Sequence, residues 1–451
     1  ADYRRNLMYQ LYEGMLGDRL NEISQKPEPP YIYAYSGYGD IVGRGSKAYQ
    51  IFAQVSDENI ENALTVLLTE NKRVLDFGFN GSELERAKQE IMRRYEKSYN
   101  ERAKTNSANI VQEYITHFLS GEPAPGIEFE FDLVKKQLPN ITIAEINELA
   151  KNWITKENRV VIITSSDKES VKLPTEARVL EIMNQIDAIK VTKYEDKVIT
   201  EPLMATLPAA GKIVKEVKLP KIEDVTELTL SNGAKVVYKK TNFKDDEIRI
   251  SAYSAGGTSL YGDADMYSAN YASQVINECG ISKFSDTDIK KMMAGKNVRI
   301  TPYIDDNSEG IFGNTSPKDV ETAFQMMHLY FTAPRKDEAL FKSFVTKNKG
   351  MYKNLLSNPQ FFFFMELEKI MSQDNPRSFG FPNPEDLDKI NLDRAFEIYK
   401  ERFANAKDFV FTIVGNFDEP TLKTLIEKYI ASLPANPTAT PEKFKDLGIR
   451  P

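Results

Sequence analysis

The sequence has 451 residues, and its 59 Lys and Arg against 66 Asp and Glu give a formal net charge of −7. At about 100–200 residues per domain, this length predicts two to four domains. Hydrophobic residues make up 41% of the chain, enough to build cores and to argue against wholesale disorder. The mild acidity excludes a typical nucleic-acid binder, because such a protein needs a basic face to neutralise phosphates.

Residues that bind metals or form disulfides are scarce. The single cysteine, Cys279, excludes an internal disulfide framework and a metal cluster built from cysteines. The chain has two histidines, His117 and His328, far apart in the sequence, although His is the usual general base and zinc ligand. Most histidine-dependent chemistry is therefore not expected here. No segment approaches the roughly 20 apolar residues of a membrane span, so none is expected.

The first 170 residues predict helices and strands in alternation. Apolar residues at three- and four-residue spacing predict an amphipathic helix from the start of the chain: Leu7, Leu11, Met15, Leu16, Leu20 and Ile23. Because the sequence opens inside a helix and without Met, we expect it to be cut from a longer parent protein. Residues 31–42 and 48–55 predict strands, and Ser56 is expected to cap the next helix. Thr142 with Glu145 predicts a capping box, and the apolar run within residues 159–164 predicts a buried strand.

The later sequence begins with a segment of weaker periodicity. Residues 171–222 contain recurring prolines and predict a linker with some local structure. Asn232-Gly233 between two apolar runs then predicts a β-hairpin, and residues 248–254 predict a third strand.

Two stretches of the chain repeat each other. The pattern of residues 51–64 recurs at residues 311–324 with an offset of 260, which pairs Ser56 with Ser316. The pattern of residues 141–162 recurs at residues 390–411 with an offset of 249, which pairs Val160 with Phe409. Two matches in register predict an internal duplication of an α+β unit of roughly 200 residues. We expect two homologous units, each a mainly antiparallel sheet with helices packed on one face.

Several phrases, in this order, resemble the pitrilysin/insulinase-type family of inverted-zincin metallopeptidases, whose long members chain four related α+β units. The phrases are residues 17–23 (GDRLNEI), 230–236 (LSNGAKV), 254–258 (SAGGT) and 411–417 (FTIVGNF). The resemblance implies that residues 1–170 are a second-unit-like domain whose N-terminal part is missing. Residues 171–222 would be a linker, and residues 223–451 a third-unit-like domain. The zinc-bearing first unit would then lie upstream, so zinc is expected there and not in this chain.

The family's zinc motif is His-x-x-Glu-His on a helix, which supplies two imidazole ligands and a carboxylate that activates water. Counted back from Gly280, the resemblance places this slot at residues 271–275, where Tyr271, Gln274 and Val275 occupy the motif positions. Both ligands and the general base are absent. We therefore predict a degenerate metal slot, no catalytic residue in this chain, and no activity of the chain alone.

The resemblance also implies substrate-contacting residues. In many family members an Arg and a Tyr of the even-numbered unit hydrogen-bond substrate carbonyls and support the developing oxyanion. Here the Arg position falls near Ser24 and Gln25, so the Arg is lost. The Tyr position falls at Tyr31 or Tyr33, and we expect at least one hydroxyl to face the cleft that opposes the missing zinc unit. The alternative is that both tyrosines are ordinary strand residues.

Three functions remain open. The first is a non-catalytic middle portion of a zinc metallopeptidase, which forms part of a peptide-holding chamber with the remaining units of the parent chain. The second is a catalytically inactive structural or peptide-binding protein on the same fold. The third, a stand-alone enzyme of unrelated chemistry, needs a catalytic constellation that the sequence does not offer. The resemblance further implies an exported, periplasmic location, as in bacterial relatives.

Overall fold

The computed structural model describes residues 2–41, 43–165, 171–378, 382–436 and 443–449. The chain divides into two compact units. Unit 1 comprises Ala1–Tyr99, Asn106–Val198 and Lys342–Phe363, and unit 2 comprises Asn100–Thr105, Ile199–Phe341 and Phe364–Pro451. Among the described residues, none of the helices combines the length and the apolar character that crossing a bilayer requires.

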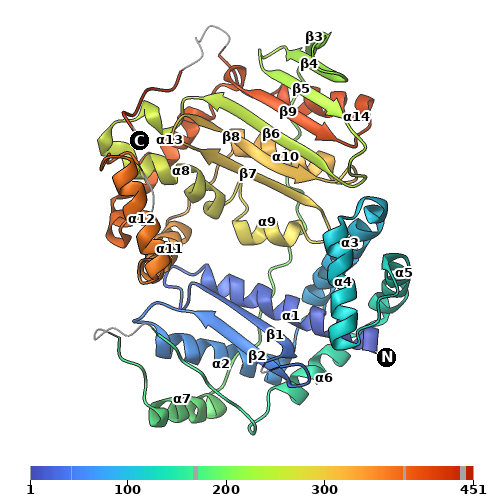
Figure 1. The fold of residues 1–451 in the computed structure, drawn as a ribbon, viewed down its shortest axis with the longest axis vertical. Coiled ribbons are helices and arrows are strands. Elements are labelled where there is room, and N and C mark those ends of the chain that lie inside the picture. The colour runs from blue at the N-terminus through green and yellow to red at the C-terminus, as the bar shows by residue number, and fades with distance from the viewer. Residues whose placement is uncertain (1, 42, 166–170, 379–381, 437–442, 450–451) are drawn as a thin grey trace. The chain divides into compact units, whose positions relative to one another are not determined.

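Unit 1 places a two-stranded sheet against helices (Figure 1). Helix α1 (Asp2–Ser24) leads into β1 (Tyr33–Asp40), which pairs antiparallel with β2 (Lys47–Gln54). The following helices are α2 (Ile60–Phe77), α3 (Gly81–Asn100), α4 (Ser107–Ser120), α5 (Ile127–Gln137), α6 (Ile143–Trp153) and α7 (Glu176–Ala188). The strand predicted at 31–42 is thus present with shorter bounds, and the strand predicted at 48–55 is present but shifted by one residue. Val42 lies outside the described residues.

The core of unit 1 forms where the apolar stripe of α1 meets the sheet and the other helices. Leu7, Leu11 and Leu20 of this stripe are buried, which confirms the predicted amphipathic helix. The capping box is also confirmed, because the Thr142 hydroxyl accepts from the Glu145 N–H at 3.3 Å and the Glu145 carboxylate accepts from the Thr142 N–H at 2.8 Å. These caps satisfy backbone donors that the first turn of α6 leaves without intrahelical partners.

Unit 2 is built on a seven-stranded sheet with the order β3-β4-β5-β9-β6-β8-β7. Its strands are β3 (Ile213–Lys218), β4 (Val225–Leu230), β5 (Lys235–Lys240), β6 (Ile248–Ala255), β7 (Val298–Ile304), β8 (Ser308–Thr315) and β9 (Val410–Gly415). Neighbouring strands pair antiparallel except β5 and β9, which are parallel. The predicted hairpin is confirmed: β4 and β5 flank Asn232-Gly233, and Gly233 adopts φ +86°, which favours glycine.

Helices of unit 2 bury apolar side chains against one face of this sheet. They are α8 (Met266–Cys279), α9 (Asp286–Met292), α10 (Val320–Thr332), α13 (Leu392–Arg402) and α14 (Glu419–Leu425). The remaining helices, α11 (Glu338–Leu356) and α12 (Pro359–Met371), contribute residues to both units. The α+β class, with mainly antiparallel sheets and helices packed against them, is as predicted.

Most elements of the predicted duplication occur in matching order. In unit 1, β2 is followed by Ser56 and α2; in unit 2, β8 is followed by Ser316 and α10. The carbonyl of each serine accepts the N–H three residues later, at 3.0 Å for Asn59 and 3.1 Å for Asp319. Helices α6 and α13 start and end at positions that fit the offset of 249. One detail is wrong: the N-cap of α2 is Asn59 and not Ser56.

The second predicted pair, Val160 with Phe409, does not fall on matching elements. Residues 159–165 form no strand, so the predicted buried strand is wrong. Val160 is 83% exposed and Ile162 79%, whereas their counterparts Phe409 and Phe411 are 1% and 0% exposed. An apolar run becomes a buried strand only if neighbouring strands pair with it. Residues 159–165 have no such neighbour in the described part of the chain.

The predicted linker is more ordered than its sequence indicates. Helix α7 belongs to unit 1 and buries Ile182 and Ile186, whereas β3 joins the sheet of unit 2 by pairing with β4. The change between units falls between Val198 and Ile199, so residues 171–222 are shared between the units.

Candidate functional site

The degenerate metal slot lies on α8. Tyr271 and Val275 are buried in unit 2, and Gln274 is exposed. A phenol, an amide and a hydrocarbon do not supply the imidazole, thiolate or carboxylate donors that zinc takes in proteins. The slot therefore does not fit a zinc ion. Throughout the described ranges, no group of three or more His, Cys, Asp and Glu side chains could hold a metal ion.

The two histidines take part in ordinary backbone contacts. His117 is exposed at the end of α4, and its Nδ1 lies 2.6 Å from the Glu122 carbonyl oxygen. His328 is buried in α10, and its Nδ1 lies 2.9 Å from the Tyr429 carbonyl oxygen. Because a carbonyl only accepts, each Nδ1 carries the proton in this arrangement.

Tyr31 and Tyr33 project to different environments. Tyr31 precedes β1, is buried, and donates its hydroxyl proton to the Leu20 carbonyl at 2.9 Å. Burial, and then the nearby negative charge of Glu70, raise the pKa of Tyr31. Tyr33 is the first residue of β1 and its side chain is exposed. Of the two candidate substrate-binding residues, Tyr33 is therefore the one that presents its hydroxyl to the surroundings.

Tyr33 belongs to an aromatic cluster on the sheet face opposite the core of unit 1. Phe52 of β2 is 40% exposed and lies directly across from Tyr35, with ring centroids 5.1 Å apart. The Tyr33 ring is 6.1 Å from Phe52. Side chains alternate between faces along a strand, so these rings share one face while Ala34 and Ile51 pack against the core.

Unit 2 carries a similar cluster at the repeat-related position. Phe312, the counterpart of Phe52, is 46% exposed on β8, and its ring lies 6.2 Å from the Tyr303 ring. Tyr253 of β6 pairs with Gly310, as does Tyr303 of β7, so the two tyrosines flank a glycine on this face. Exposed aromatic side chains that cluster on a sheet face are typical of surfaces that bind other polypeptides.

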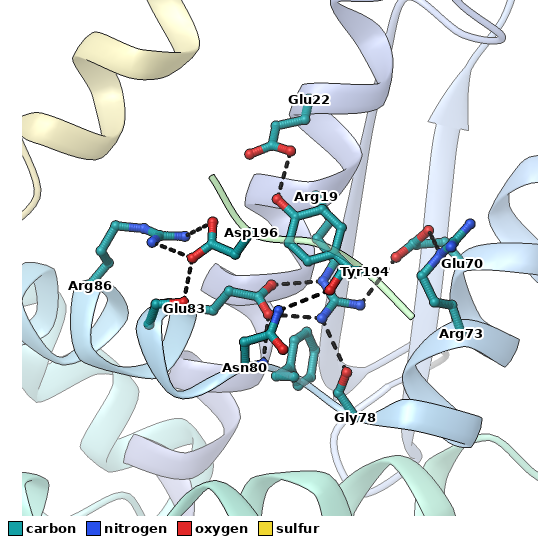
Figure 2. A network of polar contacts seen from close by, with 12 residues as sticks. Arg19, Glu22, Glu70, Arg73, Gly78, Asn80, Glu83, Arg86, Tyr194 and Asp196 are labelled. Atoms are coloured by element: carbon teal, nitrogen blue, oxygen red, sulfur yellow. Dashed lines mark hydrogen bonds and ion pairs between the residues drawn. The ribbon is translucent and has the colours of Figure 1, made fainter. Parts of the chain in front are cut away.

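The interior of unit 1 also holds a buried charge network (Figure 2). Arg19 of α1 is 1% exposed and donates two hydrogen bonds to Glu83, at 2.7 and 2.8 Å. It also donates to Glu70 at 3.3 Å and to the Gly78 carbonyl at 3.1 Å. Burial opposes the charged form, but hydrogen bonding and charge attraction from Glu83 outweigh it and raise the pKa of Arg19. These contacts hold the charge of Arg19 inside unit 1.

This network fixes residues 192–196 to unit 1. The Arg19 guanidinium lies 4.3 Å from the centre of the Tyr194 ring, and the Tyr194 hydroxyl donates to Glu22 at 2.6 Å. Asp196 accepts two hydrogen bonds from Arg86, at 2.7 and 3.0 Å (Figure 2). The segment that the sequence predicts as linker is thus held by a cation–π contact and an ion pair.

Sequence reasoning did not single out Phe52, Phe312 or the partners of Arg19. The aromatic clusters had a detectable signal, because Tyr31, Tyr33 and Tyr35 alternate with smaller residues as in a strand with two different faces. The charge network had no such sequence signal, because Arg19 and Glu83 are 64 positions apart in the sequence and only the fold brings them together.

Comparison with known proteins shows which family this chain resembles. Residues 389–449 match the family model described as the peptidase M16 inactive domain. A zinc protease PQQL-like protein of Arabidopsis thaliana is 26% identical over 440 residues, covering 97% of this chain and 40% of that protein. A probable zinc protease PqqL of Haemophilus influenzae is 22% identical over 441 residues, covering 96% of this chain and 46% of that protein. The chain thus spans less than half the length of these relatives.

A solved structure shares the fold. The ferredoxin protease FusC, crystallised as a mutant in complex with Arabidopsis ferredoxin, has a TM-score of 0.58 at 17% identity, covering 98% of this chain and 49% of that chain. The matched model and the relatives show that the chain resembles the pitrilysin/insulinase-type (M16) zinc metallopeptidases, and they support a non-catalytic part of a protease-like fold.

Proposed function

We propose that this chain forms part of the substrate chamber of a zinc-dependent metallopeptidase, whose zinc is held by a unit outside these residues. The observation that carries the proposal is the pair of exposed aromatic clusters around Phe52 and Phe312, at repeat-related positions on open sheet faces. Single exposed rings are ordinary, but rings that cluster on the open face of a sheet are typical of interaction surfaces. Aromatic residues are enriched at the centres of interfaces with other polypeptides and often carry much of the binding energy there.

The proposed partners are a polypeptide substrate and the remaining units of the parent protein. FusC is described in complex with a protein, ferredoxin, which supports a protein or peptide substrate for this chain as well. Within the chamber we assign to Tyr33 the hydrogen bond to a substrate carbonyl that the family resemblance implied for Tyr31 or Tyr33. A periplasmic or otherwise exported location is proposed from the family relationship alone.

The proposal is tested by comparing the 451-residue chain with a polypeptide of the relatives' length that contains it. The short chain is expected to bind an unfolded, fluorescently labelled protein without cleaving it. The longer polypeptide is expected to cleave it in a chelator-sensitive reaction. Phe52→Ser combined with Phe312→Ser should lower kcat/KM by roughly tenfold, since losing a binding-surface aromatic costs about 1 kcal/mol or more.

A matched control is Phe243→Ser, because Phe243 is also exposed but lies on neither sheet. This variant of the longer polypeptide should keep the kcat/KM of the unsubstituted polypeptide. Equal activity of the double variant and the control would contradict the role of the aromatic faces. A longer polypeptide that binds but never cleaves would instead identify a catalytically inactive peptide-binding protein.

A further inference from the structure

The sheet of unit 2 carries a row of polar side chains on its open face, the face opposite the helices. Strand β8 runs between β6 and β7 (Figure 1). Arg249 of β6 lies directly across from Asn314 of β8, and Arg299 of β7 lies across from the same asparagine. Because residues directly opposite each other share a face, these side chains form one row across three strands. We call it the Arg249–Asn314–Arg299 row.

This row adjoins the aromatic cluster of unit 2. Phe312 lies two residues before Asn314 on β8, so both side chains leave the same face about 7 Å apart. Beyond Phe312, on the side away from the row, Tyr253 and Tyr303 are both paired with Gly310. The open face therefore places an aromatic surface next to hydrogen-bond donors that carry positive charge.

Both arginines are accessible to a ligand. Arg299 is exposed, and no ion pair links it to another residue of the described ranges. The Arg249 side chain is 78% exposed and lies 2.7 Å from the Glu247 carboxylate. An exposed pair of this kind is weak, so a carboxylate of a ligand can take the place of Glu247. The two arginines are two strand spacings apart, about 10 Å, and their long side chains can converge on a carboxylate above Asn314.

The charge of this face is the opposite of the charge of the chain. Besides the two arginines, the strands place three lysines on it, Lys215, Lys235 and Lys239. Its carboxylates are Glu227, which pairs with Lys235 at 3.3 Å, and Glu247. The face is thus net positive, whereas the whole chain has a formal charge of −7. A local field of this sign attracts acidic partners.

The open face of unit 1 has no such charge. The residues that β1 and β2 place on it are aromatic, small or amide-bearing: Tyr33, Tyr35, Gly37, Gly39, Ala48, Gln50, Phe52 and Gln54. The two faces therefore share their aromatic character and differ in charge. A preference for acidic ligands is expected from unit 2 and not from unit 1.

We propose that the Arg249–Asn314–Arg299 row is a subsite for an acidic side chain of an extended polypeptide, two residues away from a large apolar side chain that contacts Phe312. Residues i and i+2 of an extended segment project to one side about 7 Å apart, which matches the separation of Phe312 from the row. The carboxylate accepts charge-assisted hydrogen bonds from the arginines. This inference rests on the chamber role proposed above and adds a substrate class to it.

The test measures binding of labelled peptides to the 451-residue chain by fluorescence anisotropy. Three peptides differ in one residue, Glu, Gln or Lys, two positions after a central Phe. The Glu peptide is expected to bind roughly tenfold more tightly than the Gln peptide at low salt, and the Lys peptide most weakly. High salt should reduce this difference, because exposed charges are screened. A fourth peptide with Glu directly after the Phe should bind like the Gln peptide, since its carboxylate points to the other side.

A pair of double variants locates the preference. Arg249→Gln with Arg299→Gln should abolish the preference for the Glu peptide and leave the affinity for the Gln peptide unchanged. The matched control is Lys290→Gln with Lys400→Gln, which removes the same charge from α9 and α13. These helices pack against the other face of the sheet, so the control should keep the preference.

The outcomes separate this inference from the proposed function. Equal binding of the Glu and Gln peptides, or a preference that both double variants keep or both lose, would overturn the subsite and leave the chamber role standing. If none of the peptides binds, the chamber role fails and the subsite fails with it. A single-stranded oligonucleotide that displaces the Glu peptide at lower concentration than the unlabelled peptide does would assign the row to nucleic acid and overturn the proposal.

Discussion

The Arg19 guanidinium and the Glu83 carboxylate form a two-bond ion pair, with N–O distances of 2.7 and 2.8 Å, in the interior of unit 1. Removing one member of such a pair leaves an uncompensated buried charge. Arg19→Met is therefore expected to lower the free energy of unfolding by about 3–5 kcal/mol, measured by chemical denaturation.

The control for this prediction is Lys151→Ala, which breaks an exposed pair with Glu148 and should leave the unfolding midpoint unchanged. Arg19→Met combined with Glu83→Met should recover part of the loss, because no lone charge stays buried. If the Arg19→Met variant is as stable as the unsubstituted 451-residue chain, the network does not stabilise unit 1.

Tyr194 is expected to hold residues 192–196 in place. Tyr194→Ala removes both the ring against Arg19 and the hydrogen bond to Glu22, whereas Tyr194→Phe keeps the ring contact. A cation–π contact of this kind contributes roughly 0.5–2 kcal/mol. Limited proteolysis should therefore cut the Tyr194→Ala variant near residues 189–198 faster than it cuts the unsubstituted chain. The cleavage rate of Tyr194→Phe should lie between these two. Equal cleavage of all three chains would mean that other contacts hold the segment.

The sequence predicted those parts of the fold that depend on local pattern. The α1 stripe, the Thr142–Glu145 capping box and the Asn232-Gly233 turn are all encoded within a few residues. The strand predicted at 159–164 failed because strand formation depends on a partner elsewhere in the chain. For the candidate site, the sequence resemblance supplied the expectation of a degenerate slot at residues 271–275 and of a substrate contact at Tyr31 or Tyr33. It could not separate Tyr31 from Tyr33, because two residues two positions apart share a face in a continuous strand, whereas β1 begins only at Tyr33.

The slot at residues 271–275 is expected not to bind zinc, even when the family motif is installed. Tyr271→His, Gln274→Glu and Val275→His together would place two polar rings at buried positions of α8 and should lower the unfolding midpoint. A catalytic zinc needs three protein ligands, and the described residues supply no further ligand cluster. Zinc analysis and a chelator-sensitive peptidase assay check this. Stoichiometric zinc in the unsubstituted 451-residue chain, or peptidase activity in the triple variant, would contradict this prediction.

His328 is expected to make the stability of the chain decrease on mild acidification. Burial lowers the pKa of His328 below its usual value of about 6.5, despite the hydrogen bond to the Tyr429 carbonyl. The folded state thus favours the neutral ring, while the unfolded chain takes up a proton once the pH falls below about 6.5. The stabilisation is complete above that pH and is lost as the pH falls through the lower folded-state pKa.

The free energy of unfolding should therefore decline between pH 7 and pH 5.5, with a slope of at most about 1.4 kcal/mol per pH unit for one proton. His328→Asn keeps a donor for the Tyr429 carbonyl but has no titrating ring, so it should reduce this decline. His117 provides the matched control, because it is exposed. The free energy of unfolding of His117→Asn should fall with pH as much as that of the unsubstituted chain. Denaturation midpoints at both pH values test the difference. A decline that is unchanged in His328→Asn would assign the pH dependence to carboxylates instead of to this histidine.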